Sequence, residues 1–91
     1  MESKLDELMD DETFAVDAIS HDVGIMFTEH NYAVNYLILE YADRFDAYLN
    51  LYDEGEAPFR NILVKGSSKS KEIAMSIASR KLNNEYAKIN R

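Results

Sequence analysis

The sequence contains no cysteine and no tryptophan, and it has only one proline and three glycines in 91 residues. Without cysteine, disulfide bonds, thiolate metal sites and a cysteine nucleophile are excluded. No two glycines lie within ten residues of each other, so there is no glycine-rich phosphate-binding loop. No apolar run approaches the roughly 20 residues that cross a membrane, and the acidic start MESKLDELMDDE is unlike a signal peptide. The sequence therefore predicts a protein of the reducing cytoplasm.

Hydrophobic residues make up 46% of the chain and aromatic residues 11%, which is enough to build a core. A chain of this size has room for one domain, so residues 1–91 are predicted to fold as a unit. We expect an α+β fold: an acidic helical region over 1–29, a three-stranded antiparallel sheet over 31–65 and a C-terminal helix over 68–90. Helices packed on one face of the sheet would make a stable two-layer structure.

The first region has apolar residues at helical spacing, broken only by Glu12: Leu5, Met9, Glu12, Val16, Ile19, Val23 and Met26. This stripe predicts either one helix over roughly residues 4–28 or two helical pieces broken near residues 10–13. Gly24 lies inside the stripe and costs a helix about 1 kcal/mol relative to alanine.

The middle of the chain changes to the alternating pattern of strands. FDAYLNLYD, residues 45–53, alternates cleanly and predicts a half-buried strand. Residues 32–41 suit either a strand or a short helix, and their Val, Ile and Tyr content favours a strand. FRNILVKG, residues 59–66, predicts a third strand that ends at Gly66. In the final helix, Ala74 and Ala78 are small and four apart, which would allow close approach to the sheet.

Charge is divided unevenly along the chain. Residues 1–57 hold 15 acids and two bases, whereas residues 58–91 hold eight bases and two acids. A line of carboxylates on a rigid surface can imitate phosphates and occupy a nucleic-acid-binding groove. The alternatives are a solvated face or attraction between the two halves on folding. The acidic candidates for partner binding are Asp6, Glu7, Asp10, Asp11, Glu12, Asp46, Asp53, Glu54 and Glu56.

Tyrosine is the most frequent aromatic residue, with six in the chain. Alternation places Tyr48 and Tyr52 on the outer sheet face with Asp46 and Asn50, and Tyr36 would join them from the neighbouring strand. Tyrosines on a rigid sheet make a good protein-binding surface. The alternative is the ordinary preference of tyrosine for strands.

The order helix, three strands, helix is similar to that of the double-stranded-RNA-binding domain over about residues 12–90. The more specific likeness lies in residues 66–82, which match the family's spacing of a Ser-Lys signature and paired alanines at Ser70, Lys71, Ala74 and Ala78. Glu72 and Met75 stand where the family has two further lysines. The resemblance implies a degenerate nucleic-acid binder that uses the corner formed by Lys65, Lys69 and Lys71.

Nothing in the sequence supports catalysis, a cofactor or a metal site. His21 and His30 lack the spacing of zinc ligands, and no base is placed beside a serine. In size and charge the chain is similar to small phage-encoded inhibitors of the anti-CRISPR and anti-restriction kinds. The leading hypothesis is a non-enzymatic module that docks an acidic surface on a basic nucleic-acid-handling protein. The alternatives are the nucleic-acid binder and a homodimer formed through the outer sheet face or the first helix.

Overall fold

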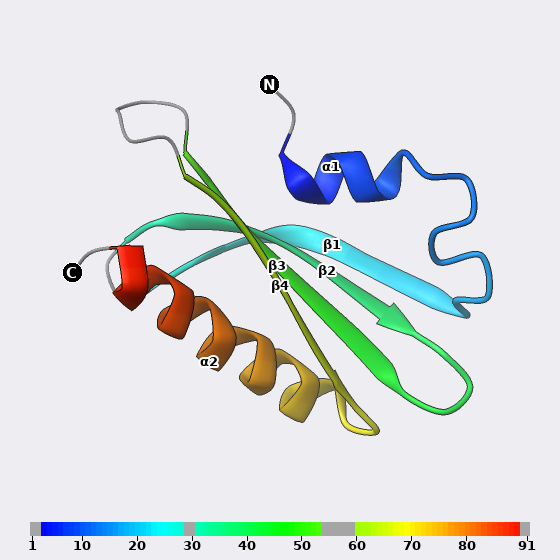
Figure 1. Ribbon diagram of the computed structural model, residues 1–91. Helices are drawn as coiled ribbons and strands as arrows, with labels where there is room; N and C mark the ends of the chain where they lie inside the picture. The colour runs from blue at the N-terminus through cyan, green and yellow to red at the C-terminus, as the bar shows by residue number, and fades with distance from the viewer. Residues whose placement is uncertain (1–2, 29–30, 54–59, 90–91) are drawn as a thin grey trace.

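The computed structural model describes residues 3–28, 31–53 and 60–89, and they form an α+β fold in three layers (Figure 1). The elements are α1 (Lys4–Met9), β1 (Ser20–Phe27), β2 (Ala33–Glu40), β3 (Phe45–Asp53), β4 (Arg60–Ser68) and α2 (Lys71–Ile89). The four strands make one antiparallel sheet in the order β1-β2-β3-β4. The predicted α+β class and antiparallel sheet are confirmed.

The prediction that residues 20–28 continue a helix is wrong, because they form β1, a fourth strand. Val23 and Ile25 are β-branched and alternate with Asp22 and Gly24, a pattern that fits a strand. The apparent helical stripe arose because Val23 and Met26 are three residues apart. In β1 these two side chains point to opposite faces of the sheet.

The other three predicted strands and the final helix are confirmed. Residues 33–40, which the sequence left open between helix and strand, form β2. β4 runs on to Ser68 rather than ending at Gly66. Residues 54–59, which connect β3 to β4, lie outside the described residues.

The prediction that the helices pack on one sheet face is also wrong, because α1 and α2 lie on opposite faces (Figure 1). Leu37, Ile38 and Leu39 are consecutive and all buried, so both faces of β2 are covered. We name one side of the sheet the α2 face; there Ala47, Leu49 and their neighbours pack against α2. What we name the α1 face packs its apolar residues under α1 and the segment after it, namely Leu37, Leu39, Tyr48 and Leu63.

α2 approaches the sheet closely at Gly66, as the small residues of the helix predicted. Ala74 and Ala78 are fully buried. A Cβ atom at Gly66 would lie 2.6 Å from the Ala78 backbone nitrogen and would also collide with the Ala74 carbonyl oxygen. Ser70 caps the helix, because its hydroxyl accepts a hydrogen bond from the Ile73 NH at 3.4 Å.

α1 is short, and polar groups of the sheet hold its first turn. The side-chain oxygen of the fully buried Asn50 accepts a hydrogen bond from the Leu5 NH at 3.1 Å. The side-chain oxygen of Asn61 accepts one from the Lys4 NH at 3.1 Å, and the Ser3 hydroxyl accepts one from the Asp6 NH. These bonds satisfy amide groups that a helix leaves free at its start.

Candidate interaction surfaces

Residues 6–17, which we name the acidic segment, carry a run of exposed carboxylates. The segment comprises most of α1 and the turns after it. Among the described residues, no base forms an ion pair with any of its six acids. One of them, Asp11, accepts hydrogen bonds from the backbone NH and hydroxyl of Thr13 at 2.9 and 2.8 Å, which lower its pKa. The exposed acids are Asp6, Glu7, Asp10, Asp11, Glu12 and Asp17.

Apolar contacts with the sheet fix the acidic segment in place. Phe14 and Ala15 pack with Leu37 and Leu39 on the α1 face. The Phe14 ring meets the Tyr48 ring edge-on, with centroids 5.5 Å apart. Ala15 holds a left-handed backbone conformation at φ 60°, which tightens the turn. The carboxylates therefore project from a defined backbone.

The expectation that Asp46 belongs to an exposed acidic surface is wrong, because Asp46 is 1% exposed. Its Oδ1 atom accepts hydrogen bonds from Ser67 Oγ at 2.7 Å and from Arg44 Nε at 3.1 Å, and Lys65 Nζ lies 3.5 Å from Oδ2. Burial raises the pKa of Asp46, but the hydrogen bonds from Ser67 and Arg44 and the nearby positive charges outweigh it. The net pKa lies below the ordinary value.

The remaining acidic candidates for partner binding lie at the end of β3 or beyond it. Asp53 ends β3, and Glu54 and Glu56 lie outside the described residues. Their role in partner binding stays a prediction.

The expectation that Tyr36, Tyr48 and Tyr52 share one exposed sheet face is wrong. Tyr36 pairs with Leu49, which puts it on the α2 face, whereas Tyr48 pairs with Leu37 on the α1 face. Tyr48 is 9% exposed because α1 and the acidic segment cover it, and burial raises the pKa of its hydroxyl. Tyr52 lies on the α1 face and is half-buried.

The three lysines of the predicted nucleic-acid corner do not form one patch. Lys65 lies on the α1 face, beside Asp46 and 5.6 Å from the centre of the Tyr48 ring. Lys71 begins α2 on the other face, with its Nζ 3.8 Å from Asp22 Oδ2. Lys69 is exposed between them. Two of the three charges thus have a carboxylate neighbour.

Sequence reasoning missed an apolar stripe on β1. Val23 is 53% exposed, Ile25 63% and Phe27 68%, and all three point to the α1 face beyond the part that the acidic segment covers. The alternation of Val23, Ile25 and Phe27 was the signal that could have revealed it. Helical spacing masked that signal.

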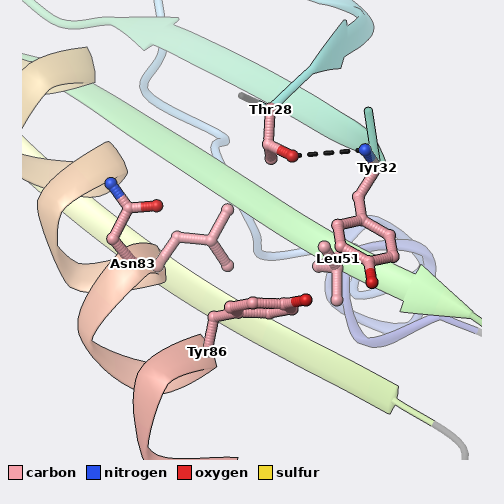
Figure 2. A pocket seen from close by; sticks show the side chains of 6 residues that line it. Thr28, Tyr32, Leu51, Asn83 and Tyr86 are labelled. Atoms are coloured by element: carbon pink, nitrogen blue, oxygen red, sulfur yellow. Dashed lines mark hydrogen bonds between the residues drawn. The ribbon is translucent and has the colours of Figure 1, made fainter. Parts of the chain in front are cut away.

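Several hollows lie between α2 and the sheet in the described part of the chain. An open groove of about 550 Å³ is bordered by Met26, Tyr36, Met75 and the Asp22–Lys71 pair. The Tyr36 side chain, which borders this groove, lies directly over Gly24. A Cβ atom at position 24 would lie 2.6 Å from the Tyr36 hydroxyl. Figure 2 shows another hollow, whose volume of about 10 Å³ gives space for about one water molecule. Its lining includes Thr28, Tyr32, Leu51, Asn83 and Tyr86.

The described residues contain no group of three or more His, Asp or Glu side chains arranged to hold a metal ion. None of the described helices has the length and apolar character that a membrane crossing requires. Comparisons of the chain with protein-family models, curated proteins and solved structures found no match.

Proposed function

We propose that this protein is a non-enzymatic binding module that docks its acidic segment on a basic surface of a nucleic-acid-handling protein. The observation that carries the proposal is the set of six exposed carboxylates on residues 6–17, none of them ion-paired to a base of the described chain. A cationic groove attracts such a surface over long range and binds it in place of phosphates.

The surface also offers apolar contact area between the charges. Met9, Val16 and Ile19 are exposed in or beside the acidic segment. Interfaces gain most of their energy from a few large side chains that lose water, while charges set the choice of partner. This mixture supports a protein partner. The proposal includes an inhibitory role of the anti-CRISPR or anti-restriction kind.

The test is direct binding to a panel of purified CRISPR effectors, restriction enzymes and other nucleic-acid-binding proteins, with duplex DNA as a competitor. We expect one or more partners to bind, to release DNA on binding, and to bind at least about tenfold more weakly when NaCl rises from about 50 to 300 mM. The double variant Asp10→Lys, Glu12→Lys should weaken binding by a similar factor.

The matched control is Glu72→Lys, Glu85→Lys, which changes the net charge equally but lies on α2. Its binding should stay close to that of the unmodified protein. Equal losses in both double variants would reduce the effect to net charge and contradict a specific acidic segment. A low-salt gel shift of the protein with duplex RNA or DNA should show no complex; a complex would favour the nucleic-acid binder instead.

A further inference from the structure

β1 and β4 are the two edges of the sheet, and they differ in how they are protected. β4 carries Arg60 and Lys65, it is covered by helices on both faces, and its Lys65 carbonyl accepts a hydrogen bond from Lys81 Nζ at 2.8 Å. Charged side chains on an edge strand discourage further pairing. β1 has no charged residue from Val23 to Phe27, and no described strand pairs with its outer edge (Figure 1).

The outward-facing backbone of β1 belongs to the same residues as its exposed apolar side chains. The Thr28 NH donates to the Tyr32 carbonyl at 3.0 Å, so the backbone of Thr28 faces β2. Backbone direction alternates along an antiparallel strand, so Met26 and Gly24 also face β2. The NH and carbonyl groups of Val23, Ile25 and Phe27 therefore point away from the sheet.

We propose that β1 pairs antiparallel with β1 of a second copy of this chain, which joins two sheets into one of eight strands. A two-fold axis at Gly24 sets Val23 opposite Ile25 of the second copy and His21 opposite Phe27 of the second copy. Every pair between outward-facing residues is then hydrogen-bonded. Because opposite residues share a face, the exposed apolar side chains of both copies meet in one cluster.

Charge is compatible with this arrangement. Asp22 is the acid within β1, and it already has Lys71 as a neighbour at 3.8 Å. With the axis at Gly24, the two copies of Asp22 are four residues apart along the strands, about 13 Å, which exceeds the screening length of about 8 Å at physiological salt. The acidic segment packs on the same sheet face as the stripe, against Leu37 and Leu39, and the repulsion between its two copies is partly screened at physiological salt. A foreign acidic or basic strand would lack the self-complementary apolar pairs.

The apolar area that pairing can bury indicates how tightly the two copies would bind. At these exposed fractions the three apolar side chains leave roughly 350 Å² uncovered in each copy. Pairing removes at most about 700 Å² of this side-chain area from water, before the strand backbones are counted, which is below the roughly 1,200 Å² at which stable specific interfaces begin. We therefore expect the dimer to be weak and reversible. This inference uses β1 alone and does not rest on the proposed function.

The first test is sedimentation equilibrium of the full chain between about 5 and 500 µM. We expect a reversible monomer–dimer equilibrium for the unmodified protein and a loss of dimer by at least about tenfold for Ile25→Lys. The matched control is Ile73→Lys on α2, which replaces an isoleucine of similar exposure, 54% against 63%. Circular dichroism spectra of both variants are to be compared with that of the unmodified protein to check that they fold. A protein that stays monomeric throughout, or a control that dissociates as Ile25→Lys does, overturns the proposal.

The second test distinguishes edge pairing from packing of two sheet faces. Amide hydrogen exchange is measured residue by residue at low and high protein concentration. We expect the Val23, Ile25 and Phe27 amides to exchange at least about fivefold more slowly at high concentration. The Asp22, Gly24 and Met26 amides, which already face β2, should change far less. Concentration-dependent protection without this alternation refutes a paired edge.

Discussion

At the scale of single residues, Gly66 limits how closely α2 and the sheet can lie. Its hydrogen occupies the space that any larger side chain would need, and the atoms around that space belong largely to the α2 backbone. Backbone cannot rotate aside as a side-chain tip can. The fully buried Ala74 and Ala78 depend on this contact.

Gly66→Ala is expected to lower the free energy of unfolding by about 2–3 kcal/mol, because it forces α2 away from β4. Urea denaturation measures the change. Gly24→Ala is the matched control: it also lies in a strand, but the atoms its Cβ would meet are the tip of the Tyr36 ring. That ring can shift, so the loss should be smaller. Equal losses would show that the close approach of α2 is not what Gly66 preserves.

Asp46 is a second residue whose effect depends on burial and partners. Its lowered pKa means that the folded protein holds the carboxylate charged more firmly than the unfolded chain does. The stabilisation is therefore fully present above the ordinary aspartate pKa of 3.8 and is lost as pH falls through the lower pKa of the folded state.

Asp46→Asn should cost about 1–3 kcal/mol near pH 7, since Arg44, Lys65 and Ser67 lose a charged acceptor. The gap between this variant and the unmodified protein should narrow as pH falls below about 4. The stability difference is measured from the midpoints of urea denaturation of both proteins between pH 7 and pH 2.5. Asp43→Asn is the control, because Asp43 also contacts Arg44 but lies exposed. A gap that stays constant with pH would contradict the role of the Asp46 charge.

At the scale of elements, α1 is the least self-sufficient part of the fold. It has six residues and would not be stable alone in water. Its attachment depends on Leu5 packed on the α1 face and on the amide acceptors of Asn50 and Asn61. Asn50 also donates to the Asn61 side chain at 3.0 Å and to the Ile62 carbonyl at 2.9 Å, which ties the helix start to β4.

Asn50→Ala should release α1 before it unfolds the sheet. We expect faster amide exchange at Leu5–Leu8, with far smaller changes in β2 and α2, and a stability loss of about 1–3 kcal/mol. Asn35→Ala is the control, since Asn35 pairs with Asn50 in the register and has no described hydrogen bond from its side chain. If exchange accelerates uniformly over the whole chain, α1 is not a separate unit.

The elements also show what the sequence could predict. β2, β3, β4 and α2 were predictable because alternation or helical spacing continues over a full element. β1 was not predictable, because the three-residue spacing of Val23 and Met26 fits a helix although both residues lie in a strand of eight residues. The faces of Asp46 and Tyr48 follow from alternation, but their burial does not. Tyr48 is covered in part by Phe14 of the acidic segment, 34 positions away, and Asp46 is enclosed by partners that include Ser67 of β4; no local pattern records either contact.

At the scale of the whole molecule, the net charge of −7 conceals two opposing effects. The acidic and basic parts of the chain meet in the described ion pairs Lys65–Asp46 and Lys71–Asp22. The six acids of the acidic segment have no such partners among the described residues. Repulsion within that segment opposes folding, whereas attraction between the two parts favours it.

We expect repulsion to dominate, so raising NaCl from about 20 to 300 mM should raise the midpoint of thermal unfolding by about 2–5 °C. Differential scanning calorimetry at low protein concentration measures the shift. In the double variant Asp10→Lys, Glu12→Lys the salt effect should shrink, while Glu72→Lys, Glu85→Lys should keep most of it. A fall of the midpoint with salt would mean that attraction between the two parts outweighs the acidic repulsion.

The strand order has a consequence for how the molecule folds. Each strand pairs with its neighbour in sequence, so the sheet forms from short chain loops that close at small entropic cost. α1 is different, because Leu5 meets Asn50 and Lys4 meets Asn61 across 45 and 57 positions. Contacts of such long range are the last to become favourable as a chain collapses. We therefore expect α1 to be the last of the described elements to reach its place during folding.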